Sequence, residues 1–225
     1  MQYRIFGDNL PAVEIQLNPG ESIYTESGGM SWMSEGMQME TNAKGGVMKG
    51  LGRMLTGESF FMATFTASRP GDSITVASSF PGHILALDLS DGREYVCQKD
   101  SFLCAQPTVT LSTEVVKGLK GGLFGGEGFF LQRLRGSGMV FLEIDGSCKE
   151  LLLAPGERIK VDTSHVALYE ASVRYSAEMV KGFKNVLFGG EGLFLTTLEG
   201  PGRVWLQTMT IASFAGRMLP YIGKD

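Results

Sequence analysis

The chain is 225 residues long, and its 31 glycines and 8 prolines, 39 residues or about 17%, fall below the share of about 25% typical of disordered low-complexity chains. Hydrophobic residues make up 43%, which is enough for a packed core, and the glycines lack the three-residue period of collagen. A formal net charge of −4 disfavours nucleic-acid binding, and two histidines are too few for a three-histidine metal site.

Three cysteines, Cys97, Cys104 and Cys148, are too few and too widely spaced for a disulfide framework or a CxxC redox or zinc motif. We expect them to be buried packing residues rather than nucleophiles. The first eight residues lack the pattern of a secretory signal, and no apolar run reaches the roughly 18 residues that span a bilayer. These features predict a cytoplasmic protein without a cofactor or metal.

Period-two alternation of apolar residues predicts strands along the chain, each followed by a glycine-containing turn. The strands with their turns are residues 13–17 before Asn18-Pro19-Gly20, 85–89 before Ser90-Asp91-Gly92, 140–144 before Asp145-Gly146, and 204–206. Glycine suits such turns because they require a positive φ, which residues with side chains resist. The pattern predicts an all-β fold.

Three segments between these strands mix glycine with basic and large apolar residues. They are residues 43–57, 114–126 and 178–190, and each precedes a Gly-Glu pair. Their glycines would interrupt a long helix. We therefore expect three loops, each with at most one or two helical turns.

An internal repeat organises the sequence. Residues 118–143 and 182–207 are identical at fifteen of 26 positions without a gap, and residues 49–77 form a more diverged third copy. A second motif, Asn18-Pro19-Gly20-Glu21, recurs as Ala154-Pro155-Gly156-Glu157, and we place Gln98-Lys99-Asp100-Ser101 at the corresponding position of the middle unit. The repeat predicts three units, residues 1–90, 91–150 and 151–225, that together form one compact unit.

Several motifs occur in the order seen in a known family. They are GGMSWM at residues 28–33, GESFF at 57–61, two FGGEG elements, VDTSHVALYE at 161–170 and Gln207-Thr208. Over about residues 1–210 the chain resembles the altered-inheritance-of-mitochondria (mitochondrial biogenesis) family, mostly uncharacterised bacterial proteins with a mitochondrial relative. The resemblance implies three tandem β-sandwich repeats around a pseudo-threefold axis, each similar to the subunit of the tryptophan RNA-binding attenuation protein. It implies no catalytic residues.

One glutamate recurs in each repeat: Glu58, Glu127 and Glu191. Under threefold symmetry these carboxylates could bind a cation or a small ligand between the repeats. The structural alternative is that each accepts backbone N–H bonds from its own glycine-rich turn.

Other motifs favour no enzyme. The Gly-Gly-Glu-Gly element lacks the Lys-Ser/Thr of a phosphate-binding loop and precedes a strand. Asp162, Ser164 and His165 are neighbours in sequence, but residues adjacent in a strand point to opposite faces and do not form a triad. We therefore expect a non-enzymatic protein.

The three loops carry cations and apolar side chains inside an acidic protein. If one face gathers them, it could contact anionic lipid or another partner, or a second copy of the chain. The alternative is that each loop covers the end of its own sandwich. We expect an interaction or scaffold protein that self-associates, with a ligand- or cation-binding module as the alternative. The residues of this face are Lys44, Lys49, Arg53, Lys117, Lys120, Phe124, Lys181, Lys184 and Phe188.

Overall fold

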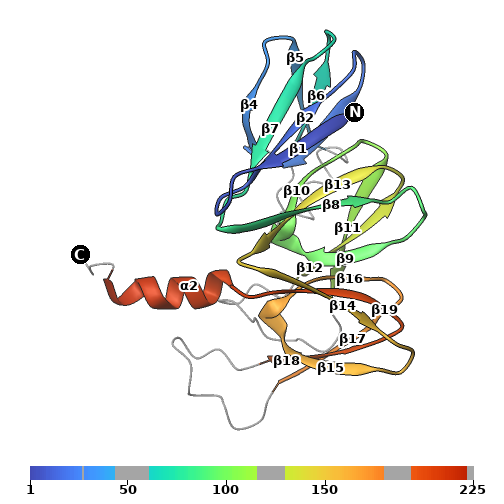
Figure 1. Cartoon of the computed structure of the whole chain (residues 1–225), viewed down its shortest axis with the longest axis vertical. Helices are drawn as coiled ribbons and strands as arrows, with labels where there is room; N and C mark the ends of the chain where they lie inside the picture. The colour runs from blue at the N-terminus through green and yellow to red at the C-terminus, as the bar shows by residue number, and fades with distance from the viewer. Residues whose placement is uncertain (27, 44–60, 116–129, 180–193, 222–225) are drawn as a thin grey trace. The chain divides into compact units, whose positions relative to one another are not determined.

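The structure is a computed structural model that describes residues 1–26, 28–43, 61–115, 130–179 and 194–221. These residues are predominantly β, which confirms the predicted class (Figure 1). The strands are β1 (Gln2–Phe6), β2 (Ala12–Gln16), β3 (Ser22–Glu26), β4 (Met30–Met33), β5 (Met37–Ala43), β6 (Phe61–Ala67), β7 (Ser73–Ala77), β8 (Gly82–Asp88), β9 (Tyr95–Gln98), β10 (Phe102–Ala105), β11 (Val109–Val115), β12 (Phe130–Gly136), β13 (Met139–Asp145), β14 (Cys148–Leu153), β15 (Arg158–Asp162), β16 (Val166–Glu170), β17 (Arg174–Met179), β18 (Phe194–Glu199) and β19 (Gly202–Gln207).

Short helices complete the described chain. The 3-10 helices η1 (Lys99–Ser101) and η2 (Thr163–His165) each join two strands, and the helix α2 (Ile211–Met218) continues into the 3-10 helix η3 (Leu219–Tyr221).

The chain divides into two compact units, each built from segments that are separated in sequence. Unit 1 comprises Met1–Gly92, Ser101–Thr110 and Arg135–Glu143, and unit 2 comprises Arg93–Asp100, Leu111–Leu134 and Ile144–Asp225.

Unit 1 contains two sheets. One has the strand order β1-β2-β7-β4 and the other β5-β6-β3-β10-β13-β8. Val13 of β2 and Ile74 of β7, from the first sheet, lie in one apolar core with Ile23, Phe65 and Phe141 from the second. All five are at most 1% exposed, so the sheets pack as a β-sandwich on the alternating apolar residues of their facing sides.

Unit 2 repeats this construction with a six-stranded sheet, β11-β12-β9-β16-β19-β14, and a three-stranded sheet, β15-β18-β17. Its core joins Val96, Val166 and Val204 of the larger sheet to Phe194 and Leu198 of the smaller one. The alternation predicted for residues 204–206 is thus anchored by Val204, which is fully buried.

The strand pairings recur along the chain at intervals of six strands. β3 pairs with β6, β9 with β12 and β15 with β18. β4 pairs with β7, β10 with β13 and β16 with β19, and each of these pairs has one extra residue, Ser31, Leu103 or Ala167, at which the register shifts. Two further pairs join strands across the interval: β10 pairs with β3, and β16 pairs with β9.

Two of the predicted turns have the same geometry. Gly20 and Gly156 adopt φ of 85° and 77°, values at which glycine is favoured. In each turn the glutamate carboxylate accepts a 2.8 Å bond from a backbone N–H three residues earlier, Asn18 for Glu21 and Ala154 for Glu157. This bond lowers the pKa of Glu21.

The position predicted for the corresponding turn of the middle unit is wrong. Gln98 ends β9 and Lys99–Ser101 form η1 before β10, whereas the connection between β8 and β9 contains Gly92, with φ of 79°. The Gly92 N–H donates to the Leu89 carbonyl at 3.0 Å, so the predicted turn Ser90-Asp91-Gly92 is confirmed in that place. The Asp-Gly pair, rather than the polar run after β9, is the signal for this turn.

Candidate interaction surfaces

The predicted site residues lie outside the part of the chain that the structure describes, so these predictions remain open. They comprise the three repeated glutamates and all the cations and phenylalanines of the loop face: Glu58, Glu127, Glu191, Lys44, Lys49, Arg53, Lys117, Lys120, Phe124, Lys181, Lys184 and Phe188.

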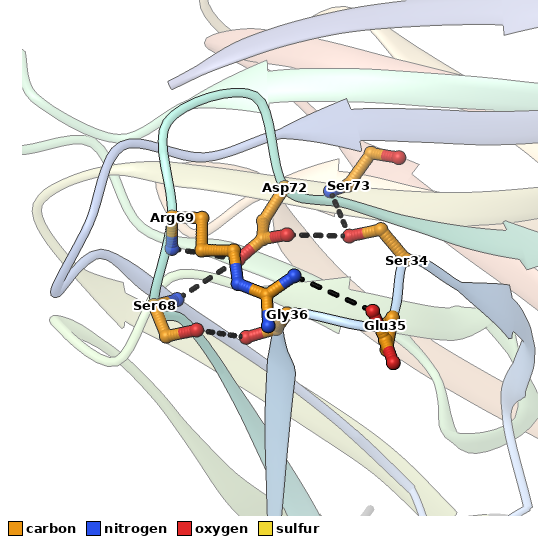
Figure 2. Close-up of polar contacts among 7 residues, drawn as sticks. All are labelled: Ser34, Glu35, Gly36, Ser68, Arg69, Asp72 and Ser73. Atoms are coloured by element: carbon orange, nitrogen blue, oxygen red, sulfur yellow. Dashed lines mark hydrogen bonds and ion pairs between the residues drawn. The ribbon is translucent and has the colours of Figure 1, made fainter.

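Asp72 of unit 1 is a buried carboxylate, 5% exposed, that is held by several hydrogen bonds (Figure 2). It accepts bonds from the Ser34 hydroxyl at 2.9 Å and from the backbone N–H groups of Ser68 and Arg69 at 3.0 and 2.8 Å. Burial alone would raise the pKa of Asp72, but these hydrogen bonds outweigh it and lower the pKa.

Hydrogen bonds through Asp72 link the residues before β5 to the turn before β7. Ser34 Oγ accepts a 3.0 Å bond from the Ser73 N–H while it donates to Asp72 (Figure 2). A Cβ at Gly36 would lie 2.3 Å from a carboxylate oxygen of Asp72, so only glycine allows this approach. The network is satisfied by the protein itself, which makes it a structural element and leaves little acceptor capacity for a ligand.

His165 and Ser164 do not bond to each other. The Ser164 hydroxyl donates to Asp162 at 2.6 Å. His165 Nδ1 lies 2.7 Å from the Gln207 carbonyl oxygen, and because a carbonyl only accepts, Nδ1 is the donor. Ser164 and His165 both lie in the 3-10 helix η2, so the strand geometry expected for them is wrong.

The cysteines differ in burial. Cys97 and Cys104 are fully buried, as predicted, and burial raises the pKa of both thiols, to about 12 for Cys97. Cys148 is only half-buried, and burial followed by the charge of Glu150 raises its pKa. The two buried thiols are therefore packing residues.

An aromatic surface, formed by Phe6 of β1 and Trp32 of β4, lies exposed on the outer side of the four-stranded sheet. Trp32 is 54% exposed and Phe6 36% exposed, and their ring centroids are 6.3 Å apart. The Arg4 guanidinium lies 5.5 Å from the centre of the Phe6 ring. On the next strand Thr75, the cross-strand partner of Trp32, is 1% exposed, and its hydroxyl has no hydrogen-bond partner among the described residues.

A shallow hollow of about 370 Å³ opens on the same sheet, over β1, β2 and β7. Its polar lining includes the ion pair between Arg4 and Glu14, whose atoms are 3.1 Å apart. The Arg4 side chain is 73% exposed and that of Glu14 is 37% exposed, so solvent screens this pair and it contributes little to stability.

The helix α2 presents an apolar stripe. Ile211, Phe214 and Met218 follow the i, i+3, i+7 spacing of one helix face and are 41–51% exposed. The helix begins at Thr210, whose hydroxyl accepts a 3.1 Å bond from the Ser213 N–H. None of its residues is buried, and Figure 1 shows α2, in red, extending away from the strands of unit 2. The sequence reasoning missed this helix, although the cap residue and the spacing were visible.

No described helix is long and apolar enough to cross a membrane. No group of three His, Cys, Asp or Glu side chains in the described ranges is placed to hold a metal ion.

The family comparison agrees with the order of the motifs. The family model described as Mitochondrial biogenesis AIM24 matches residues 3–209. The chain belongs to this family. The match ends just before α2, so the helix with the exposed apolar stripe lies beyond the part of the chain that the AIM24 family model covers.

Two relatives of this AIM24-family chain come from Streptococcus pyogenes. An uncharacterised protein of serotype M6 is 29% identical over 220 residues, which are 94% of this chain and 87% of that protein. A crystal structure of an S. pyogenes protein matches with a TM-score of 0.79 and 27% identity, over 98% of this chain and 99% of that one. The fold is therefore shared along nearly the whole length of both chains.

Proposed function

We propose that this AIM24-family protein is a non-enzymatic interaction or scaffold protein that self-associates. The observation that carries the proposal is the exposed apolar stripe of α2. A helix of eight residues is too short to be stable alone in water, because isolated helices need about 12–15 residues. Packing of an apolar face normally supplies the missing stability, yet in the described part of the chain Ile211 and Met218 remain 51% and 43% exposed.

The three basic and apolar loops extend this proposal. If they share one face, they give the protein a second surface for another copy, for a partner or for anionic lipid. Support for this part comes from their sequence alone, since the loop residues lie outside the described ranges.

The repeat architecture belongs to the same proposal. We propose three tandem β-sandwich repeats with pseudo-threefold symmetry, each similar to the subunit of the tryptophan RNA-binding attenuation protein. The recurring strand pairings support six strands per repeat, β2–β7, β8–β13 and β14–β19, which assigns β8 to the middle repeat. An experimental structure in which a third of a turn superposes successive repeats would support the symmetry, and one without such an axis would refute it.

Sedimentation velocity over a wide concentration range tests the proposal. We expect the mean mass of the full chain to rise with concentration, and Phe214→Ser on the apolar stripe to reduce that rise. Ala212→Ser, off the stripe on the same helix, is the matched control. A chain that stays monomeric at every concentration would refute self-association. Flotation with anionic vesicles run in parallel identifies membrane contact if the protein moves with the lipid.

A ligand-binding module is the second candidate, because the hollow over β1, β2 and β7 is lined by polar groups. A thermal-shift screen of metal ions and small metabolites tests it. A compound that raises the melting temperature of the full chain, and does so less for Glu14→Gln, would support this reading.

A further inference from the structure

Equivalent strands of the recurring pattern do not all have the same number of neighbours. Some lie inside a sheet, and others lie at its edge. β3 and β9 each have strands on both sides, β6 and β10 for the first and β12 and β16 for the second, whereas β15 pairs only with β18 in the described chain. Likewise, β10 and β16 have two neighbours each, whereas β4 pairs only with β7. In the described part of the chain, β4 and β15 therefore each have an unpaired edge at which the equivalent strands have a neighbour.

The two closed junctions share one register. The first residue after the extra residue is Cys104 in β10 and Leu168 in β16. Cys104 lies opposite Thr25 of β3, and Leu168 lies opposite Cys97 of β9. The next residues continue the match, since Ala105 lies opposite Tyr24 and Tyr169 opposite Val96.

The residues of β4 and β15 that correspond to these junction residues can be identified from the register. Trp32 is the first residue after the extra residue in β4, as Cys104 and Leu168 are in theirs. On the other edge, Thr196 of β18 aligns with Gln132 of β12 in the repeated sequence, and their cross-strand partners are Val161 and Cys97. Val161 therefore corresponds to Cys97.

Burial separates the open edges from the closed junctions. Cys104, Leu168 and Cys97 are each 0% exposed. Trp32, at the equivalent position of the open edge, is 54% exposed, and Val161 is partly exposed. A large apolar side chain thus lies in solvent at a position that a neighbouring strand buries in the other two cases.

We infer that β4 of one copy pairs antiparallel with β15 of a second copy, with Trp32 opposite Val161 and Met33 opposite Lys160. This inference rests on the proposed self-association and adds a strand-edge contact to the apolar stripe of α2. The pairing joins the four-stranded sheet of one copy to the three-stranded sheet of the next and repeats the β10–β3 and β16–β9 junctions between molecules. Because the two edges differ, the contact is head-to-tail and generates rings or filaments.

The charges beside these edges have partners within their own chain. Glu35, in the turn after β4, lies 3.4 Å from Arg69, and Arg158 of β15 lies 2.7 Å from Glu199. The register is therefore carried by the strand positions and their burial. A second copy is the occupant because β4 and β15 do not pair with each other within the described chain, which leaves the third junction of the proposed pseudo-threefold pattern open.

Disulfide trapping tests the register. Met33→Cys and Lys160→Cys are prepared as separate full-length chains in a Cys148→Ser background, mixed and oxidised; the remaining cysteines, Cys97 and Cys104, are buried. Directly opposite residues lie close enough for a disulfide. We expect a cross-linked heterodimer from the mixture and none from either chain alone. Met33→Cys mixed with Val161→Cys is the control, because a one-residue slip points the two side chains to opposite faces.

The outcomes separate the two claims. A mixture that sediments as monomers and does not cross-link refutes both the self-association and this inference. A mixture that oligomerises without the Met33–Lys160 cross-link refutes the inference alone. A chain that carries both substitutions and forms the bond within itself at high dilution shows that its own β15 is the occupant, which overturns the second copy.

Discussion

Replacing Trp32 by alanine is expected to weaken assembly while the chain stays folded. The Trp32 side chain is 54% exposed, and a tryptophan buries up to about 250 Å² when fully covered, so about 135 Å² remains for a partner. At about 25 cal/mol per Å² this area corresponds to about 3 kcal/mol. Since about 1.4 kcal/mol is a tenfold change, Kd should rise on the order of a hundredfold.

The fold should tolerate this change because most of what Trp32 loses is contact with solvent. Its described ring contact is with Phe6 at 6.3 Å, and such a pair contributes about 0.5–1.5 kcal/mol. In a chain of this size, about 1 kcal/mol lowers the melting temperature by about 2–4 °C. A small fall in melting temperature and a large rise in Kd therefore distinguish a contact residue from a core residue.

Sedimentation velocity gives Kd for both the wild type and Trp32→Ala, and thermal unfolding measured by circular dichroism gives the stability. Leu152→Ala is the matched control, because Leu152 is an apolar residue 71% exposed on β14, a strand that the inference leaves at an edge. The reasoning is refuted if Trp32→Ala leaves Kd unchanged, or if Leu152→Ala weakens assembly as much.

Three further predictions concern the described core and its charges. Phe141→Ala should destabilise the chain by about 3–5 kcal/mol, since the residue is fully buried. A double-mutant cycle with Tyr3→Ala, measured by urea unfolding, should give a coupling energy of about 0.5–1.5 kcal/mol, because the two rings make an edge-to-face contact at 5.0 Å. Additive effects of the two substitutions would contradict that contact. Cys148 should react with iodoacetamide at pH 8 while native Cys97, whose pKa is raised to about 12, stays unlabelled by mass spectrometry; labelling of Cys97 at an equal rate would contradict its burial. The pKa of Asp72 is lowered in the folded chain, so its carboxylate stabilises the fold above the ordinary carboxyl pKa, and this stabilisation is lost as pH falls through the lowered pKa. The free energy of unfolding of an Asp72→Asn chain should therefore fall less than that of wild type between pH 5 and 2. Parallel losses in the two chains would argue against the lowered pKa.

Local features of the fold were readable from the sequence because they depend on a few neighbouring residues. Turns at Gly20, Gly92 and Gly156 are marked by glycine beside proline or aspartate, and the buried alternation of Val13 and Ile15 reports one face of β2. The misplaced turn of the middle unit failed for the same reason, since no proline or glycine marks residues 98–101.

The pairing of strands that are distant in sequence could not be predicted from such local patterns. Nothing local in β3 indicates that β10, almost eighty residues later, lies beside it, because hydrogen bonds between backbones carry no sequence signature. Phe141 illustrates the limit: alternation in β13 assigns it to an outward face, yet it is fully buried, because both faces of that strand are covered. The candidate surfaces at Trp32 and α2 emerged only from burial, which depends on these distant partners.

The interleaved composition of unit 1 constrains the order in which the protein folds during synthesis. Its larger sheet needs β10 and β13, and its core includes Phe141, so the first 92 residues lack part of their own sandwich when they leave the ribosome. Until Ala105 has emerged, β3 lacks its partner β10 and exposes an unsatisfied backbone edge, and β10 in turn lacks β13 until Asp145 has emerged. The two units therefore cannot fold one after the other during translation. Unit 1 completes its fold only after part of unit 2 has been synthesised.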